Sequence, residues 1–275
     1  MKKKLLVFMA AMMTMLILAA CGTEDETTSA TKEVFKVGME AGYAPFNWTQ
    51  TTDANGGVKI NGGAEYAGGY DVEIAKKIAE GLGKELVIVK TEWDGLVPAL
   101  QSGVVDAIIA GMSPTEERKE SIDFTENYYT SDFVIVTKKG GAYENAKTLA
   151  DFSGAKITAQ LNTTNYKVID QIPNVKMQSA MDNFPAMRVA IESGVIDGYV
   201  AERPEAISAA AANENFTYTV LEDGFKTDPA DVAVAVGVRK DFDLTSQIND
   251  VLKGISESDR QKLMEDAIAN QPAAQ

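Results

Sequence analysis

The sequence predicts an α/β protein made of two lobes with similar topology, because one phrase occurs twice within two similar runs of strands and helices. ALQSGVVDAIIA at residues 99–110 and AIESGVIDGYVA at residues 190–201 share six of twelve positions at an offset of 91 residues. Each copy has the pattern of a helix end, a glycine stop and a buried strand. Such punctuation can recur by chance, but the same element order surrounds both copies, which favours two related lobes.

The first half of the chain alternates strands with helices. Apolar residues at helical spacing indicate helices at 70–83 and 93–103, each ended by a glycine. The expected strands are 33–39, 85–91 and 104–110. The continuous apolar run of the second strand is typical of a strand buried on both faces. Strand and helix in alternation predict a parallel sheet.

The same alternation restarts in the second half. The strands expected there are 155–160, 174–180 and 195–201, with helices at 163–172 and 181–194. A further strand at 232–238 and an amphipathic segment at 244–268 complete the chain. The Gly-, Asn- and Asp-rich stretch 51–69 indicates a hairpin or surface loop and lacks the spacing of a phosphate-binding loop.

The first twenty residues have the pattern of an export signal. Three lysines precede an apolar run from Leu5 to Ala20, and the single cysteine, Cys21, follows directly. LAAC at residues 18–21 is similar to the lipobox of bacterial lipoproteins, in which that cysteine is lipidated; the alternative is a chance cysteine after an uncleaved signal anchor. Residues 1–20 are therefore predicted to be a lipoprotein signal peptide, Cys21 the lipidated residue and residues 21–33 a flexible tether.

Charge and composition exclude several classes of function. The formal net charge is −14, so nucleic acid is a poor partner. The chain has no histidine, which excludes Ser-His-Asp and Cys-His catalysis and histidine metal sites. We expect no catalytic residue, no metal and no cofactor.

Candidate ligand-binding residues follow the repeated strands, because ligands of open α/β sheets bind beyond the carboxyl ends of the strands. After the first copy, Ser113 is placed to cap a helix, where N–H groups attract an anion. Arg118, one turn further on, can clasp a carboxylate with two parallel hydrogen bonds. Alternatively, Arg118 is a surface residue paired with Glu117 or Asp123.

The second lobe offers a comparable set. Thr163 and Thr164 open a helix and offer hydroxyl and N–H groups to an anion, unless they only cap that helix. Glu202 ends the second repeated strand and is a candidate partner for an ammonium group, or else a solvated surface carboxylate.

Several motifs together resemble the bacterial extracellular solute-binding proteins of family 3, the polar amino-acid receptors of ABC importers. They are GYAPF (42–46), GYDVEIAKKIAEGLG (69–83), WDGLVPALQSGVVDAIIAGMSPTEER (93–118), IDFTENYY (122–129) and DGYVAERPEA (197–206). The resemblance covers residues 34 to about 265. It implies a two-lobed periplasmic-binding-protein (flytrap) fold of type II. Lobe 1 comprises residues 34–132 plus 233–275, lobe 2 comprises 133–232, and hinge strands lie near Ser131–Phe133 and Asp231–Ala233.

The resemblance also implies a set of ligand contacts. The α-carboxylate of an amino acid meets Arg118, Ser113, Thr164 and Thr163, and its α-ammonium meets Glu202 and the Gly111 carbonyl. The ligand side chain lies between Tyr43 and Trp93, with Glu40 and Gln160 at the far end. Without the resemblance, Tyr43 and Trp93 are more simply interpreted as core residues.

Two aromatic faces and a carboxylate suit a cation, so we expect arginine or lysine as ligand, then histidine or glutamine. The implied protein is a monomeric, extracytoplasmic receptor, lipid-anchored to the outer face of the cell membrane, that delivers a free L-amino acid to an ABC transporter permease. Two alternatives remain open: an extracytoplasmic enzyme on the same fold, such as a prephenate or arogenate dehydratase, and a ligand sensor that signals through a partner.

Overall fold

The computed structural model describes residues 32–272 of the 275-residue chain. The predicted signal peptide, the lipidation site at Cys21 and all but the last two residues of the predicted tether lie outside the described residues. Among residues 32–272, no helix has the length and apolar character that crossing a membrane requires.

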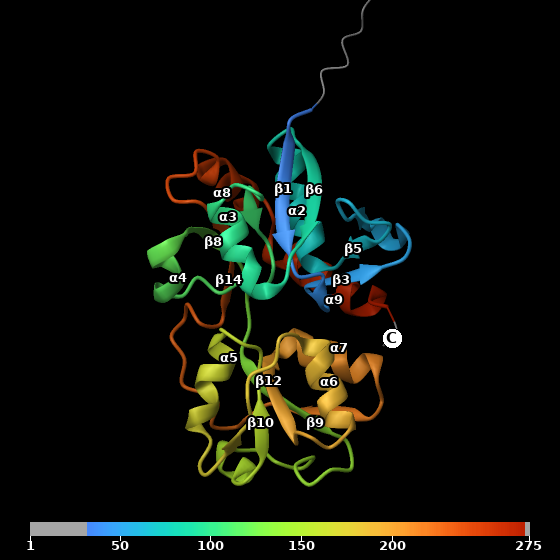
Figure 1. Cartoon of the computed structure of the whole chain (residues 1–275), viewed down its shortest axis with the longest axis vertical. Helices are drawn as coiled ribbons and strands as arrows, with labels where there is room; N and C mark the ends of the chain where they lie inside the picture. Colours follow the sequence, from blue (N-terminus) through green and yellow to red (C-terminus); the bar gives the residue numbers. More distant parts are fainter. Residues whose placement is uncertain (1–31, 273–275) are drawn as a thin grey trace, which may run out of the picture. The chain divides into compact units, whose positions relative to one another are not determined.

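Lobe 1 is the part of the chain built on a five-stranded sheet of order β6-β1-β7-β14-β8 (Figure 1). The strands are β1 (Val34–Met39), β6 (Glu85–Lys90), β7 (Ala107–Ile108), β8 (Asp123–Thr130) and β14 (Ala233–Val238). β1 pairs in parallel with β6 and β7, whereas β14 pairs antiparallel with β7 and β8. The three strands expected to form a parallel sheet do so, and the sheet is mixed because β14 joins it in antiparallel orientation.

Strand β6 is not buried on both faces, in contrast to the expectation from its apolar run. It lies at the edge of the sheet, and only Ile88 is fully buried. Beyond its pairing with β1, its further strand pairing among residues 32–272 is an isolated bridge from Ile88 to Ile60. An apolar run alone does not tell an edge strand from a central one.

A second, smaller sheet and five helices complete lobe 1. The antiparallel sheet β2-β3-β5-β4 is made of β2 (Gly42–Tyr43), β3 (Asn47–Gln50), β4 (Val58–Lys59) and β5 (Tyr66–Gly68), so the stretch 51–69 forms part of a hairpin as expected. The helices are α2 (Tyr70–Gly81), α3 (Leu96–Gln101), α4 (Glu116–Ser121), α8 (Thr245–Lys253) and α9 (Glu257–Asn270). The segment 244–268 is thus two helices. Gly254 caps the first, and the side chain of Ser256 accepts the Asp259 N–H at the start of the second.

Lobe 2 is built on the five-stranded sheet β11-β10-β12-β9-β13. Its strands are β9 (Phe133–Lys138), β10 (Lys156–Thr158), β11 (Lys176–Met177), β12 (Gly198–Glu202) and β13 (Phe216–Thr219), and its helices are α5 (Thr164–Lys167), α6 (Phe184–Glu192) and α7 (Arg203–Ala212). The two copies of the repeated phrase contribute β7 and β12, and each of these is the central strand of its sheet.

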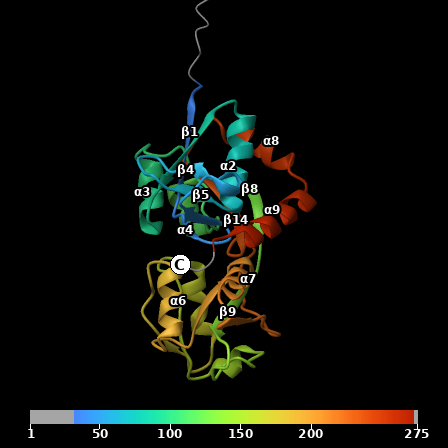
Figure 2. The same ribbon diagram turned by 90° about the vertical axis from the view of Figure 1, so that its right-hand side faces the viewer.

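Two segments run between the lobes (Figures 1 and 2). β8 of lobe 1 leads directly into β9 of lobe 2, and the chain returns from lobe 2 into β14. A hydrogen bond joins the two segments between the lobes: the Ser131 N–H donates to the Val232 carbonyl at 2.9 Å. This is the expected two-lobed fold with two connecting strands.

The main hydrophobic core continues from one lobe into the other. It contains residues of lobe 1 such as Phe46 and residues of lobe 2 such as Phe184 and Tyr199. A second core lies within lobe 2, around Phe152 and Ile169. The two lobes therefore touch through buried aromatic side chains as well as through the connecting strands.

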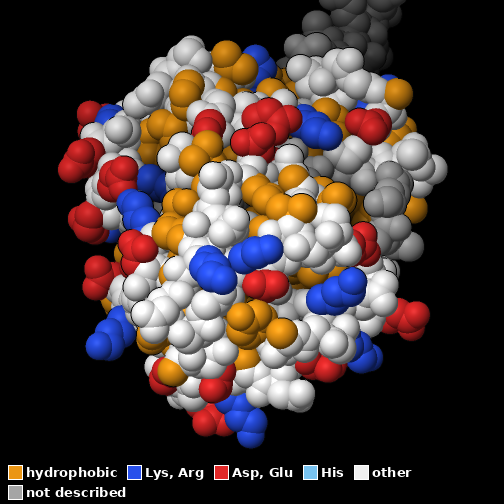
Figure 3. Space-filling view, turned by 60° about the horizontal axis from the view of Figure 1, so that its bottom comes forward, with side chains coloured by type: hydrophobic (Ala, Val, Ile, Leu, Met, Phe, Trp, Pro, Cys, Tyr) orange, Lys and Arg blue, Asp and Glu red, His pale blue; other side chains and the backbone are white. Residues whose placement is uncertain are grey.

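The surface is mixed in charge. On the face seen in Figure 3, Lys and Arg side chains lie among Asp and Glu side chains. Most of the ion pairs in the described residues involve exposed partners, such as Lys262 with Asp266. Such pairs contribute little to stability, about 0–1 kcal/mol each.

Candidate functional site

A small cavity lies where the lobes meet, and its walls come from both. Lobe 1 contributes Tyr43, Trp93, Gly111, Ser113 and Arg118, and lobe 2 contributes Gln160, Thr163, Thr164, Asn165, Phe184 and Glu202. The structure thus brings together every residue predicted for the ligand site except Glu40. The cavity measures about 20 Å³, which is room for about one water molecule. A larger molecule enters only if the walls move apart.

The chain following β7 is shaped by Gly111. This residue has φ +62°, and a Cβ atom on it would lie 2.6 Å from the ring of Tyr43, so a side chain is excluded on both grounds. The Gly111 N–H donates to the Tyr128 hydroxyl at 3.3 Å, and that hydroxyl donates to Asp71 at 2.7 Å. The buried Asp71 therefore fixes, through Tyr128, the backbone that lines the cavity.

The helix after Gly111 begins later than expected. Thr115, not Ser113, is the N-cap of α4, and its hydroxyl accepts the Arg118 N–H. The Ser113 hydroxyl instead donates to the Asp231 carbonyl at 3.0 Å. The prediction that Ser113 caps the helix is wrong, because the extended backbone that precedes a helix persists for two more residues.

Arg118 spans the boundary between the lobes. Its guanidinium donates to the Ser113 carbonyl at 2.9 Å and, across the boundary, to the Asn162 carbonyl at 3.0 Å, and it lies 5.1 Å from the centre of the Trp93 ring. Burial lowers the pKa of Arg118 to about 10, and nearby carboxylates act in the opposite direction, so it stays charged at neutral pH.

The alternative of a surface ion pair for Arg118 does not hold. Glu117 pairs with Lys167, and Asp123 pairs with Lys240 at 2.8 Å. Within residues 32–272, no carboxylate oxygen lies within 4 Å of the Arg118 guanidinium nitrogens. The guanidinium faces the cavity with carbonyl partners only, which do not neutralise its charge.

Glu202 is the corresponding negative group. It ends β12, is 7 % exposed and accepts a hydrogen bond from the Tyr43 hydroxyl of the other lobe. Burial raises the pKa of Glu202, and the bond from Tyr43 offsets part of the rise. In the described part of the chain, no lysine or arginine lies within 4 Å of its carboxylate.

The two threonines differ. Thr163 caps α5, since its hydroxyl accepts the Tyr166 N–H at 3.4 Å and donates to the Gln160 carbonyl at 2.6 Å. Thr164 lies beside Asp231, with 3.5 Å between its hydroxyl and the carboxylate, at the limit of a hydrogen bond. Both line the cavity, but α5 has only four residues, so its dipole adds little.

Glu40 lies next to the cavity rather than in its lining. The Gln160 amide donates to both Glu40 oxygens at 3.1 Å across the lobe boundary, and Glu40 lines an adjoining open groove of about 690 Å³. Burial raises the pKa of Glu40 to about 7; Gln160 opposes this rise, and the charge of Glu92 adds to it. Glu40 therefore changes its charge near neutral pH.

Sequence reasoning missed Phe184 and Asn165. Phe184 stacks on Tyr43, with ring centres 4.5 Å apart and planes at 12°. The offset of 91 residues between the repeated phrases also relates Trp93 to Phe184 and Gly111 to Glu202. The repeat thus carried a signal for Phe184, because Trp93 and Phe184 begin corresponding helical segments.

The family of the chain follows from a match over most of its length. The model of the bacterial extracellular solute-binding proteins, family 3, matches residues 35–268. The chain belongs to this family. The family-3 match includes every residue that lines the cavity.

Individual relatives of this family-3 protein agree with that assignment. It is 34% identical over 223 residues to a probable histidine-binding protein of Campylobacter jejuni, covering 76% of this chain and 80% of that protein. It is 29% identical to the arginine-binding extracellular protein ArtP of Bacillus subtilis, with 94% of each chain covered. An amino-acid ABC transporter substrate-binding protein of Streptococcus pneumoniae, solved with L-arginine, superimposes with a TM-score of 0.76 and 28% identity, covering 86% of this chain and 94% of that one.

Proposed function

We propose that this family-3 protein is an extracytoplasmic receptor that binds one free L-amino acid between its lobes and delivers it to an ABC importer. The observation that carries the proposal is the pair Arg118 and Glu202. They bring opposite charges to one cavity, and neither has an oppositely charged partner within 4 Å among the described residues. A zwitterion supplies both missing charges.

Each pole of the ligand has a partner in this proposal. The α-carboxylate meets the Arg118 guanidinium, the backbone at Ser113, and the start of α5 at Thr163 and Thr164. The α-ammonium meets Glu202 and the Gly111 carbonyl. These contacts come from both lobes, so the ligand binds best when the lobes are together.

Ligand entry requires an exchange of contacts. The Tyr43 hydroxyl now bonds Glu202, and Arg118 bonds the Asn162 carbonyl, in both cases across the lobe boundary. Separation of the lobes about the segments near Ser131 and Val232 breaks both bonds. When the lobes close, the ligand ammonium takes the place of the Tyr43 hydroxyl at Glu202, and the ligand carboxylate takes the place of the Asn162 carbonyl at Arg118.

The ligand side chain points toward Glu40 in this arrangement. Tyr43, Trp93 and Phe184 supply aromatic faces, and Glu40 with Gln160 forms a polar end. Aromatic faces attract cations by about 0.5–2 kcal/mol, and a carboxylate adds to that attraction. We therefore propose arginine or lysine as the preferred ligand, then histidine or glutamine, in keeping with the arginine- and histidine-binding relatives.

The remaining parts of the proposal concern the chain as a whole. Residues 34–132 plus 233–275 form one lobe and residues 133–232 the other. The protein acts as a monomer, anchored to the outer face of the membrane through lipid on Cys21. Electrospray mass spectrometry of the mature protein tests the anchor, because acylation adds a defined mass to an N-terminal Cys21.

Calorimetric titration with each of the twenty amino acids tests the proposed ligand. We expect binding at one site per molecule, tightest for arginine or lysine. Tight binding of glutamine with no heat from arginine contradicts the preference for a cation. An absence of binding to every amino acid contradicts the receptor function itself.

We further propose that the protein binds its ligand without chemical turnover. Glu40, with its pKa of about 7, is the residue that could act as a general acid or base in an enzyme. It hydrogen-bonds Gln160 and stands outside the cavity lining, where it suits a ligand side chain. Incubation with prephenate or arogenate is expected to give no product, and product formation that stops in Glu40→Gln contradicts this proposal.

A further inference from the structure

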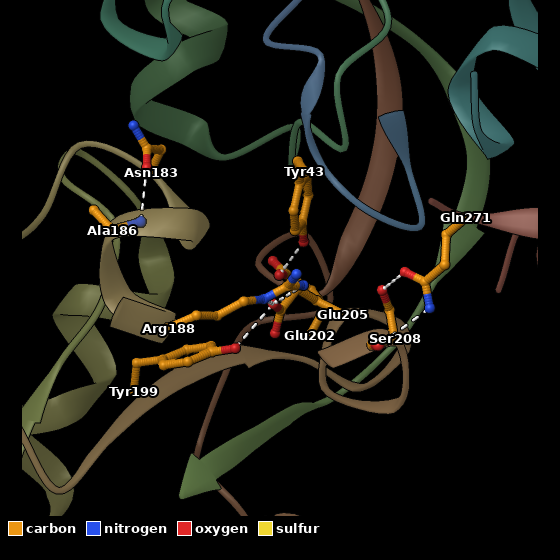
Figure 4. A network of polar contacts seen from close by, with 9 residues as sticks. All are labelled: Tyr43, Asn183, Ala186, Arg188, Tyr199, Glu202, Glu205, Ser208 and Gln271. Atoms are coloured by element: carbon orange, nitrogen blue, oxygen red, sulfur yellow. Dashed lines mark hydrogen bonds and ion pairs between the residues drawn. The ribbon is translucent and has the colours of Figure 1, made fainter. Parts of the chain in front are cut away.

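An ion pair between the partly buried Arg188 and the buried Glu205 lies behind Glu202 (Figure 4), and Arg188 also lines the open groove beside Glu40. Glu205, one helical turn further along α7, is 0% exposed. The Arg188 guanidinium donates to its Oε1 at 2.8 and 3.2 Å, and the Tyr199 hydroxyl donates to the same oxygen at 2.9 Å. Neither Arg188, Glu205 nor Tyr199 lines the cavity.

The pair is connected to the ligand site through the helix that carries Arg188. Phe184 lies one turn before Arg188 on α6 and stacks on Tyr43, whose hydroxyl bonds Glu202. Phe184 also meets Tyr199 edge to face, with ring centres 6.0 Å apart. The Arg188–Glu205 bond ties α6 to α7, and the contacts through Tyr43 tie the same two helices together at the cavity.

The pair also sets the local charge. Two buried carboxylates, Glu202 and Glu205, lie one turn apart, and the charge of Glu202 raises the pKa of Glu205. Burial raises that pKa most, and Arg188 opposes it. The Oε2 atom of Glu205 is buried and has no hydrogen-bond partner among the described residues, so Arg188 and Tyr199 together satisfy one oxygen only.

We propose that Arg188 and Glu205 are positioning residues of the ligand site: Arg188 cancels the charge of Glu205, so that a ligand ammonium meets the charge of Glu202 alone. This inference rests on the proposed amino-acid receptor function. The ammonium of the ligand brings the second positive charge to a cluster of two carboxylates and one guanidinium. The cluster is neutral when the ligand is bound.

The proposal predicts how the charge of Arg188 acts when its partner is removed. Among the described residues, Tyr43 from β2 and Arg118 from α4 act directly on Glu202, Glu205 from α7 interacts with it, and Arg188 from α6 pairs with Glu205. In Glu205→Gln, no carboxylate at position 205 cancels the positive charge of the Arg188 guanidinium. The guanidinium repels the ligand ammonium, and it favours the ionised form of Glu202.

The test is calorimetric titration between pH 4.5 and 8 with arginine and with glutamine, whose neutral side chain separates the titration of Glu202 from that of Glu40. Four proteins are compared: wild type, Glu205→Gln, the double variant Arg188→Met/Glu205→Gln, and Arg188→Lys. We expect Glu205→Gln to bind about tenfold more weakly than wild type at pH 7. On the acid side of the pH profile, its affinity should fall at a lower pH than that of wild type, because the Arg188 charge lowers the pKa of Glu202. The double variant removes both charges and recovers to within about threefold of wild type. Arg188→Lys keeps the charge and binds within about threefold of wild type.

A matched control is Arg239→Met, which breaks the 3.5 Å ion pair with Asp106 before β7, at the end of the strand away from Gly111. Its affinity is expected to equal that of wild type. Melting curves and the binding stoichiometry show whether each variant is folded. If Glu205→Gln does not fold, the double variant still tests the proposal, because it leaves neither Arg188 nor Glu205 as an unpaired charge.

Two outcomes overturn the inference. Wild-type affinity in Glu205→Gln shows that the pair does not act on the ligand. Equal weakness of Glu205→Gln and the double variant, with an unchanged acid side of the pH profile, shows a role in packing only. Failure of the wild-type protein to bind any amino acid is a different result, which removes the proposed function as well.

Discussion

At the scale of single residues, Arg118 combines partial burial with a charge that no carboxylate in the described structure neutralises. Its carbonyl partners Ser113 and Asn162 come from opposite lobes, and its guanidinium covers the Trp93 ring. A carboxylate can replace both carbonyls at once, because the guanidinium presents parallel N–H groups. The geometry therefore favours an anion over a neutral oxygen at this position.

We expect Arg118→Gln to lower amino-acid affinity about 100-fold, since losing one partner of a desolvated, hydrogen-bonded ion pair costs about 2–5 kcal/mol. Arg118→Lys keeps the charge but loses the fork, and its affinity falls between the two. Calorimetry measures all three proteins, and melting curves serve as the folding control. Wild-type affinity in Arg118→Gln contradicts the assignment of the carboxylate to this residue.

Glu40 gives the site a pH dependence with a definite sign. Its pKa is raised from 4.5 to about 7, so below pH 7 it is largely protonated and must release a proton to pair with a cationic ligand side chain. Arginine affinity should therefore rise with pH, at most about tenfold per pH unit below 7, and level off above it. Calorimetry in buffers of different ionisation enthalpy should show about 0.9 proton released per ligand at pH 6 and about 0.1 at pH 8.

Glutamine separates this effect from that of Glu202. It carries the same α-ammonium and α-carboxylate as arginine but a neutral side chain, so any proton released from Glu202 is common to both ligands. The difference between arginine and glutamine belongs to Glu40 and should vanish in Glu40→Gln. An equal proton release for the two ligands in wild type argues against a cation next to Glu40.

At the scale of elements, helix α7 is held by lobe 1 at two places. Its N-cap Glu202 bonds Tyr43. Two turns later, Ser208 bonds the side chain of Gln271, which follows α9: the Ser208 hydroxyl donates to it, and the Gln271 amide returns a bond of 3.1 Å to the Ser208 carbonyl. Both contacts are drawn in Figure 4. The second contact joins the two lobes outside the cavity lining.

We expect Gln271→Ala to weaken ligand binding by about 5- to 150-fold, because it removes two hydrogen bonds of about 0.5–1.5 kcal/mol each from the closed form only. Calorimetry measures the affinity. The matched control is Gln261→Ala on the same helix α9, where the amide reaches only Glu257 of its own helix, at 3.5 Å. Equal affinities in the two variants refute a role for the Gln271 contact in closure.

Most helices and strands could be predicted from the sequence, but their neighbours in the sheets could not. The glycines after α3 and α6 and the apolar strands after them have local signals. The edge position of β6 and the antiparallel pairing of β14 depend on strands distant in the chain, which no local pattern shows. The start of α4 was misplaced because Ser113 and Thr115 both have the chemistry of a cap.

At the scale of the whole molecule, the contacts that matter most for function join residues far apart in the chain. Tyr43 and Glu202 are 159 residues apart, and Glu40 and Gln160 are 120 apart. The repeated phrase indicated two lobes, and the family motifs indicated which residues meet. Neither indicated that the polar groups of the two walls bond one another, nor that Arg188 and Glu205 lie behind Glu202.

Closure of the lobes is the physical basis of the account. Tyr43, Gln160 and Arg118 all make hydrogen bonds across the boundary, and the cavity between them holds about 20 Å³. A bound amino acid adds charge-assisted bonds to both walls, so it shifts the equilibrium toward closed lobes by its differential affinity for that form. The two lobes and the ligand then form one buried polar unit.

The most direct test is a crystal structure of the protein with L-arginine, or with whichever amino acid binds most tightly. We predict the ligand carboxylate within about 3 Å of the Arg118 guanidinium and the ligand ammonium at the same distance from Glu202, in a single molecule held by both lobes. A ligand bound to one lobe only, or at a place where Arg118 and Glu202 do not both touch it, contradicts the account.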